Sequence, residues 1–135
     1  MKKKILFLLV AFLTISGATI GKSKENVEVL YFTANLCPCK ARVCNALQAD
    51  VDSVLIKYFQ NENIEFKVIK LSDQANKELV TKFNAKSQTV VIVSTKRKKE
   101  NVIDVSDVVA NYSKSKDKVK FETEMKDKIN EILKM

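Results

Sequence analysis

Apolar residues change their period along the chain, and each change predicts a different element. Residues 27–33 (VEVLYFT) form a β-rich run that becomes apolar on both faces at its end, which is typical of a central, buried strand. From Pro38 onward, apolar side chains recur every four residues, which predicts a long helix with one face toward the core. The expected core face of this helix comprises Val43, Ala46, Leu47, Val51, Val54, Leu55, Ile56 and Phe59.

The rest of the chain continues to alternate between strand and helix patterns. Residues 64–68 alternate apolar and charged side chains, and residues 89–95 form a continuous β-branched run, so both are predicted strands. A polar turn at 96–101 leads to a short fourth strand at 102–105, which predicts a hairpin. Helical segments are expected at about 72–84, with Ser72 or Asp73 as N-cap, within 104–112, and from Lys116 to the end. The apolar face of the last helix comprises Phe121, Met125, Ile129 and Leu133.

This order of elements, β-α-β-α-β-β-α, predicts the fold class. A strand, a helix and a second strand imply a right-handed parallel crossover, and the later hairpin adds antiparallel strands. We therefore expect an α/β, thioredoxin-like fold: a central mixed four-stranded sheet with helices on both faces. With 135 residues, the chain is long enough for one such domain, which we place at residues 22–135.

Residues 1–21 are expected to be a secretory signal peptide. Three lysines at positions 2–4 precede an apolar run at 5–15, and small residues at 16–18 suit cleavage after Ala18 or Gly21. The apolar run is shorter than the roughly 20 residues that a transmembrane helix needs. The prediction is export to the periplasm or the medium, with membrane contact only through this segment; the alternative is an uncleaved anchor. Disulfides can form in such a compartment.

Charge and composition narrow the chemistry. The chain carries 24 basic and 16 acidic residues, and removing residues 1–21 leaves 21 basic residues and a net charge of +5. The basic run Lys96–Lys99 contains no aromatic residue for base stacking, so we expect a solvated hairpin tip and no nucleic-acid partner. Histidine is absent, which excludes catalytic triads and bases that need imidazole. Three cysteines remain as the obvious reactive groups.

Two of these cysteines, Cys37 and Cys39, lie where the first predicted strand gives way to the first predicted helix. The N-terminus of a helix carries unpaired N–H groups and a partial positive charge, which stabilise a thiolate and lower the pKa of a thiol there. Lys40 and Arg42 add positive charge nearby, and Pro38 suits a first helical turn. The sequence therefore predicts nucleophilic thiols near neutral pH.

The same residues carry a resemblance to a known family. The run Val27–Phe32, the motif Cys37-Pro38-Cys39-Lys40-Ala41, residues 64–68 and the lysine-rich last helix resemble the ArsF-type thioredoxin-like proteins, the nitrophenyl compound nitroreductase subunit family. The resemblance implies that Cys37 is the exposed, attacking thiol and that Cys39 is its resolving partner. Members of that family typically have two residues between the cysteines, whereas this chain has one. Typical thioredoxins also place a cis-proline before the third strand, where this chain has Ser87-Gln88-Thr89.

The expected function is thiol–disulfide exchange on exported proteins, as an oxidoreductase or an isomerase. The expected partners are protein thiols or disulfides and a redox protein that restores the resting state; no cofactor is required. A disulfide across a single residue closes a small strained ring, which favours its reduction.

Cys44 and two alternative functions stay open. Cys44 lies about 7.5 Å along a regular helix from Cys39 and roughly 140° around it, which is awkward for direct bonding. It is either an alternative catalytic thiol that resolves the mixed disulfide or a buried cysteine that acts as a small apolar side chain. The alternatives to thiol exchange are binding of a thiophilic ion such as Cu(I) or arsenite by the cysteine cluster, and a catalytically silent adaptor.

Overall fold

The computed structural model describes residues 25–36 and 38–135; Cys37 and the expected signal peptide lie outside the described residues. The elements are β1 (Asn26–Thr33), α1 (Pro38–Tyr58), β2 (Ile64–Lys70), the 3₁₀ turn η1 (Gln74–Asn76), α2 (Lys77–Lys82), β3 (Val90–Lys96), β4 (Lys99–Asp104), α3 (Ser106–Ser115) and α4 (Lys118–Leu133). All of the strands predicted from the sequence are present, with shifted ends.

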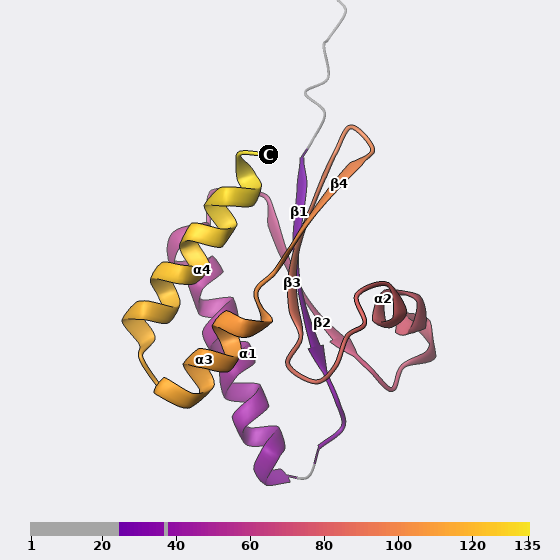
Figure 1. Cartoon of the computed structure of the whole chain (residues 1–135), viewed down its shortest axis with the longest axis vertical. Coiled ribbons are helices and arrows are strands. Elements are labelled where there is room, and N and C mark those ends of the chain that lie inside the picture. The colour runs from indigo at the N-terminus through magenta and orange to yellow at the C-terminus, as the bar shows by residue number, and fades with distance from the viewer. Residues whose placement is uncertain (1–24, 37) are drawn as a thin grey trace, which may run out of the picture.

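The four strands form one mixed sheet in the order β2-β1-β3-β4. β1 pairs in parallel with β2 and antiparallel with β3, and β3 pairs antiparallel with β4. α1, α3 and α4 cover one face of the sheet and α2 lies on the other (Figure 1). The predicted α/β class, with a mixed four-stranded sheet between helices, is confirmed, and the strand order and directions are consistent with a thioredoxin-like arrangement.

β1 is buried on both faces because it lies inside the sheet. Val27, Val29 and Tyr31 point into the larger hydrophobic cluster, on the side of α1 and α4. Leu30 and Phe32 alternate with them and belong to the smaller cluster, on the side of α2. This is the pattern expected of an interior strand, where both faces need apolar side chains.

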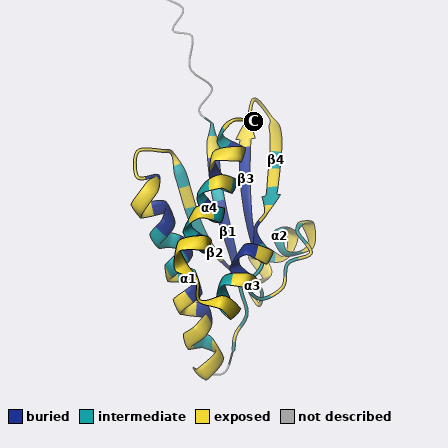
Figure 2. Cartoon of the chain, turned by 60° about the vertical axis from the view of Figure 1, so that its left-hand side comes forward, coloured by how far each residue is buried: buried dark blue, intermediate teal, exposed yellow. Residues whose placement is uncertain are grey.

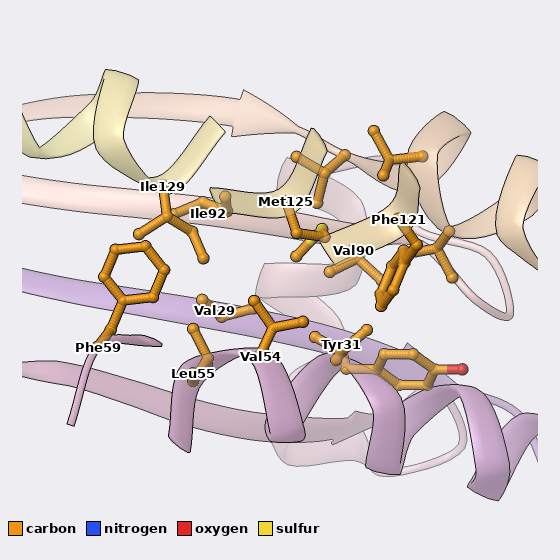
Figure 3. Close-up of a cluster of buried hydrophobic side chains, with 14 of the residues drawn as sticks. Val29, Tyr31, Val54, Leu55, Phe59, Val90, Ile92, Phe121, Met125 and Ile129 are labelled. Atoms are coloured by element: carbon orange, nitrogen blue, oxygen red, sulfur yellow. The ribbon is translucent and has the colours of Figure 1, made fainter. Parts of the chain in front are cut away.

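The larger core lies between the sheet, α1 and α4. Figure 3 shows side chains from all of these elements gathered in one cluster, and Figure 2 shows the buried surfaces of the helices turned toward the sheet. At the far end of α1, Glu122 of α4 accepts hydrogen bonds from the Tyr58 hydroxyl (2.6 Å) and the Lys57 ammonium (2.8 Å), which links the two helices. The labelled core residues are Val29, Tyr31, Val54, Leu55, Phe59, Val90, Ile92, Phe121, Met125 and Ile129.

The buried face of α1 differs from the predicted one. Val43 and Ile56 are 46% and 63% exposed, and Ala46 is exposed as well, whereas Cys44 is buried. Four residues advance a helix by about 400°, so an every-fourth-residue stripe drifts about 40° per step around the axis. Over the length of α1 this drift carries Val43 away from the core, and the buried set is Cys44, Leu47, Val51, Val54 and Leu55.

The hairpin between β3 and β4 is tighter than predicted. Lys96 pairs with Lys99, so only Arg97 and Lys98 form the turn, and both have positive φ angles, 49° and 68°. Two consecutive left-handed residues match the twist of an antiparallel pair, as in type I′ turns. β4 therefore begins at Lys99, not at the predicted Val102, because the charged residues of the basic run continue the strand.

Of the two helices after the hairpin, α3 is longer than predicted, whereas α4 lies within the predicted range. The expected helical turn within 104–112 is a ten-residue helix, α3, which ends where Lys116 takes a left-handed φ of 57°. Asp117 then caps α4 by accepting a hydrogen bond from the Lys120 amide. On the other face, Asp73 caps η1 in the same way through the Ala75 amide, as its sequence position suggested.

The burial pattern predicts different costs for one substitution at two helical sites. Ile129→Ala in α4 opens a cavity in the larger core and should lower the free energy of unfolding by about 2–5 kcal/mol. Ile56→Ala in α1 removes an exposed side chain and should change it by no more than about 0.5 kcal/mol. Urea unfolding followed by circular dichroism measures both. Equal losses would contradict the burial of Ile129 and the exposure of Ile56.

Candidate functional site

Cys39 lies in the first turn of α1 and is exposed to solvent. This end of α1 lies at one end of the molecule (Figure 1). α1 follows β1 after a short loop and has no acidic residue in its first turn, while Lys40 and Arg42 are exposed beside Cys39. The partial positive charge of the helix N-terminus is therefore reinforced and not neutralised by nearby side chains. Cys37, the predicted attacking thiol, lies outside the described residues.

Cys44 occupies a different environment on the same helix. It is 3% exposed, forms no disulfide, and its sulfur accepts a hydrogen bond from the side-chain amide of Gln88 at 3.2 Å. The structure does not bring Cys44 together with Cys39, which is exposed in the turn before it. A role for Cys44 in resolving a mixed disulfide stays a prediction, and it would require α1 to open locally.

Gln88 belongs to the loop that precedes β3, where typical thioredoxins carry the cis-proline. Its backbone is left-handed, with a φ of 68°, and its amide donates to the Phe32 carbonyl at 2.8 Å. The Phe32 amide in turn donates to the Thr89 carbonyl at 2.8 Å. These bonds fix the loop to the end of β1, from which the chain continues toward the cysteines. Gln88 therefore lies where typical thioredoxins have the cis-proline, and its side chain contacts Cys44 of α1 from there.

The hydrogen bond between Tyr31 and α1 is a feature of this region that sequence reasoning did not predict. Its ring is buried under α1, and its hydroxyl donates a hydrogen bond to the Cys44 carbonyl at 3.2 Å. Burial, with a smaller effect of the neighbouring Cys44, raises the pKa of the Tyr31 phenol well above its usual range. The available signal was a hydroxyl-bearing ring inside the apolar run 29–32, since buried tyrosines usually find a partner for that hydroxyl.

The loop that carries the cysteines is also tied to the chain after β2. The Asn35 side-chain amide donates to the Ser72 hydroxyl at 3.3 Å, and the Leu71 amide donates to the Thr33 carbonyl at 2.9 Å. The start of α1 is therefore approached by the turn after β2 and, through Gln88, by the loop before β3. These hydrogen bonds hold the loop before α1 against neighbouring segments and so help to fix the position of the exposed first turn of α1.

The described residues contain neither a cluster of metal-ligating side chains nor a membrane-spanning helix. Within 25–36 and 38–135, no three histidine, cysteine, aspartate or glutamate side chains are grouped so that they could hold a metal ion. In that same part of the chain, no helix has the length and apolar character required to cross a bilayer.

Comparisons with known proteins do not assign the chain to a family. No family model matches it, and no curated protein matches it. A solved structure described as that of a malarial protein is 26% identical, over 63% of this chain and 91% of the other, with a TM-score of 0.37.

The two described cysteines should differ in reactivity toward N-ethylmaleimide. In the reduced Cys37→Ser protein, Cys39 should be alkylated rapidly, and Cys44 at least about a hundredfold more slowly, because labelling of a buried thiol waits for local opening. Peptide mass spectrometry after timed quenching gives both rates. Similar rates would contradict the burial of Cys44, and full labelling of both thiols in urea is the control.

The buried phenol of Tyr31 predicts a specific loss of stability in alkali. Because folding raises its pKa, the unfolded chain loses the phenolic proton first, so stability is intact below about pH 10 and falls as pH rises further. Tyr31→Phe should cost about 0.5–1.5 kcal/mol at pH 8, through the lost hydrogen bond. Between pH 10 and 11.5 the wild-type advantage should shrink by up to about 1.4 kcal/mol per pH unit. Parallel stability curves for the two proteins would refute this.

Proposed function

We propose that this protein carries out thiol–disulfide exchange on exported proteins, through Cys37 and Cys39 at the start of α1. The observation that carries the proposal is the exposed position of Cys39 in the first turn of a 21-residue helix whose N-terminal turn contains no acidic residue. A thiol in that setting is open to solvent and lies beside the partial positive charge of the helix N-terminus, where a substrate disulfide can reach it. Cys37 is two residues earlier in the sequence, so both thiols belong to the same short segment.

The proposed reaction has two exchange steps. The Cys37 thiolate attacks one sulfur of a substrate disulfide; a new bond joins Cys37 to the substrate, and the other substrate sulfur leaves as a thiolate that takes up a proton. The Cys39 thiolate then attacks the Cys37 sulfur, forms the Cys37–Cys39 disulfide and releases the second substrate sulfur as a thiol. The substrate gains two electrons and two protons, which the cysteine pair loses. The reverse sequence oxidises a substrate dithiol.

The close spacing of the two cysteines bears on the partners required. A Cys37–Cys39 disulfide spans a single residue, and such a strained ring is a better oxidant than a relaxed disulfide. A protein that acts as a reductant would therefore need a thiol donor protein in the same compartment to regenerate its dithiol. The apolar N-terminal segment supports the periplasm or the medium as that compartment.

Single substitutions test the two roles. Cys37→Ser should reduce the rate of cleavage of a fluorogenic disulfide-linked peptide, with dithiothreitol as donor, to the uncatalysed background. Cys39→Ser should still form the mixed disulfide but release it slowly, so a covalent adduct with the peptide should accumulate in non-reducing mass spectra. Recovery of activity from scrambled ribonuclease tests isomerisation with the same variants.

Cys44→Ala is the matched control, because it removes a thiol that the structure places in the core. It should retain exchange activity. Full activity in Cys37→Ser would overturn the proposal. If the wild-type protein is inactive and its reduced form binds Cu(I) at a stoichiometry of one, with loss of binding in Cys37→Ser, the cysteines form a soft-metal site; inactivity without metal binding would leave the adaptor role.

A further inference from the structure

A groove lies between α1 and the end of α3, close to the cysteine-bearing turn. Its α1 wall is made by Arg42, Val43, Ala46 and Leu47, and Tyr112 and Lys116 form the opposite side. Its volume is about 260 Å³. Pockets that enclose small molecules hold roughly 300–1,000 Å³, so this groove suits one or two side chains of a longer segment.

The α1 residues at the edge of the groove share one face of the helix with the exposed cysteine. Positions 39, 42, 43 and 46 follow the i, i+3, i+4, i+7 spacing that places residues on one helical face, and all four are exposed. At 1.5 Å per residue, Arg42 and Ala46 lie about 4.5 and 10.5 Å along the axis from Cys39. An extended chain covers about 3.3 Å per residue, so the groove is reached within roughly two to three residues of a sulfur bound at that turn.

The apolar residues of this face were predicted to be core residues and are not. Val43 is 46% exposed, and Ala46 is also exposed, although both continue the apolar pattern of α1. Leu47, buried beneath them, forms the floor of the groove. Two exposed apolar side chains beside an apolar floor are what a docking site for an aliphatic side chain provides.

The charge balance of the groove is positive. Arg42 and Lys116 form no ion pair with any residue in the described part of the chain. The one carboxylate of the lining, Asp50, already accepts a hydrogen bond from the Tyr112 hydroxyl at 2.9 Å and lies 3.5 Å from the Lys118 ammonium. The Asp50 carboxylate is therefore partly neutralised by Lys118. The positive charges of Arg42 and Lys116 are not neutralised by an ion pair and can attract an acidic ligand.

We propose that this groove docks an acidic segment of the substrate protein, with an aliphatic side chain against Val43 and Ala46 and carboxylates beside Arg42 and Lys116. The segment lies a few residues from the substrate cysteine that reacts at the start of α1. The identity of the segment as part of a redox substrate rests on the proposed function. The binding itself needs no thiol, so it can be measured without the reaction.

Binding is tested with the Cys37→Ser/Cys39→Ser protein and fluorescein-labelled octapeptides that lack cysteine. The first contains two glutamates and a leucine, the second replaces glutamate by glutamine, and the third by lysine. Fluorescence anisotropy at low salt should show the acidic peptide binding at least about tenfold more tightly than the lysine peptide, with added salt reducing the difference. Equal affinities for the three peptides would overturn the inference.

Matched variants locate the binding site on the surface. Arg42→Glu with Lys116→Glu should weaken binding of the acidic peptide about tenfold. Lys77→Glu with Lys134→Glu changes the net charge equally at exposed positions outside the groove and should have little effect. Val43→Ser should weaken binding, whereas Ile56→Ser, at another exposed apolar position on α1, should not. Equal effects within either pair would refute the site, and thermal unfolding confirms that each variant folds.

Two further outcomes separate this inference from the proposed function and from self-association. Exchange activity that is lost in Cys37→Ser but shows no preference for disulfide peptides with acidic flanks would refute the groove and leave the function standing. Groove-dependent peptide binding by a protein without exchange activity would refute the function and leave the groove. A dimer in sedimentation that Val43→Ser dissociates would mean that a second copy covers the groove, and would overturn the proposal.

Discussion

The position of β1 inside the sheet is the constraint on which the rest of the structure depends. Because β2 pairs on one side of it and β3 on the other, both of its faces must be covered, and its alternating side chains divide the molecule into two cores. Its last residues also organise the cysteine end of the domain. Tyr31 bonds to the Cys44 carbonyl in α1, and the backbone of Phe32 pairs with Gln88 and Thr89 of the loop before β3.

Sequence periodicity predicted the strands and helices because each helix buries one face against the sheet and each strand alternates its side chains between the two faces of the sheet. It failed where the pattern was ambiguous within an element. Val43 and Cys44 are adjacent small apolar residues at the start of α1, and only the rotation of the helix against β1 decides which is buried. The hairpin tip was misjudged because charged residues such as Lys99 and Glu100 were assigned to a turn, although an edge strand accommodates them.

The candidate site was predictable only where it depends on residues close together in the sequence. Local rules placed Cys39 at a helix N-terminus, because the end of a strand and a proline mark that boundary in the sequence. The contacts of Cys44 with Tyr31 and Gln88 join residues 13 and 44 positions apart, and nothing in a local window indicates such pairs. The groove beside Cys39 likewise depends on where α3 ends, since Tyr112 and Lys116 close it from a distant part of the chain. The surroundings of Cys44 and the shape of the groove therefore depend on contacts between distant parts of the chain, which sequence periodicity does not predict.

The unequal covering of the two faces of the sheet has a dynamic consequence. Three helices seal the larger core, but only η1 and the six-residue α2 cover the smaller one, with Leu79, Val80 and Phe83 partly buried against it. Segments with few buried contacts open at a lower free energy than the whole domain, so amide hydrogens of α2 should exchange with solvent well before those of α4. Such openings would leave α1 and its link to α4 through Glu122 in place. The α2 side of the domain can thus unfold locally while the cysteine-bearing helix α1 keeps its orientation.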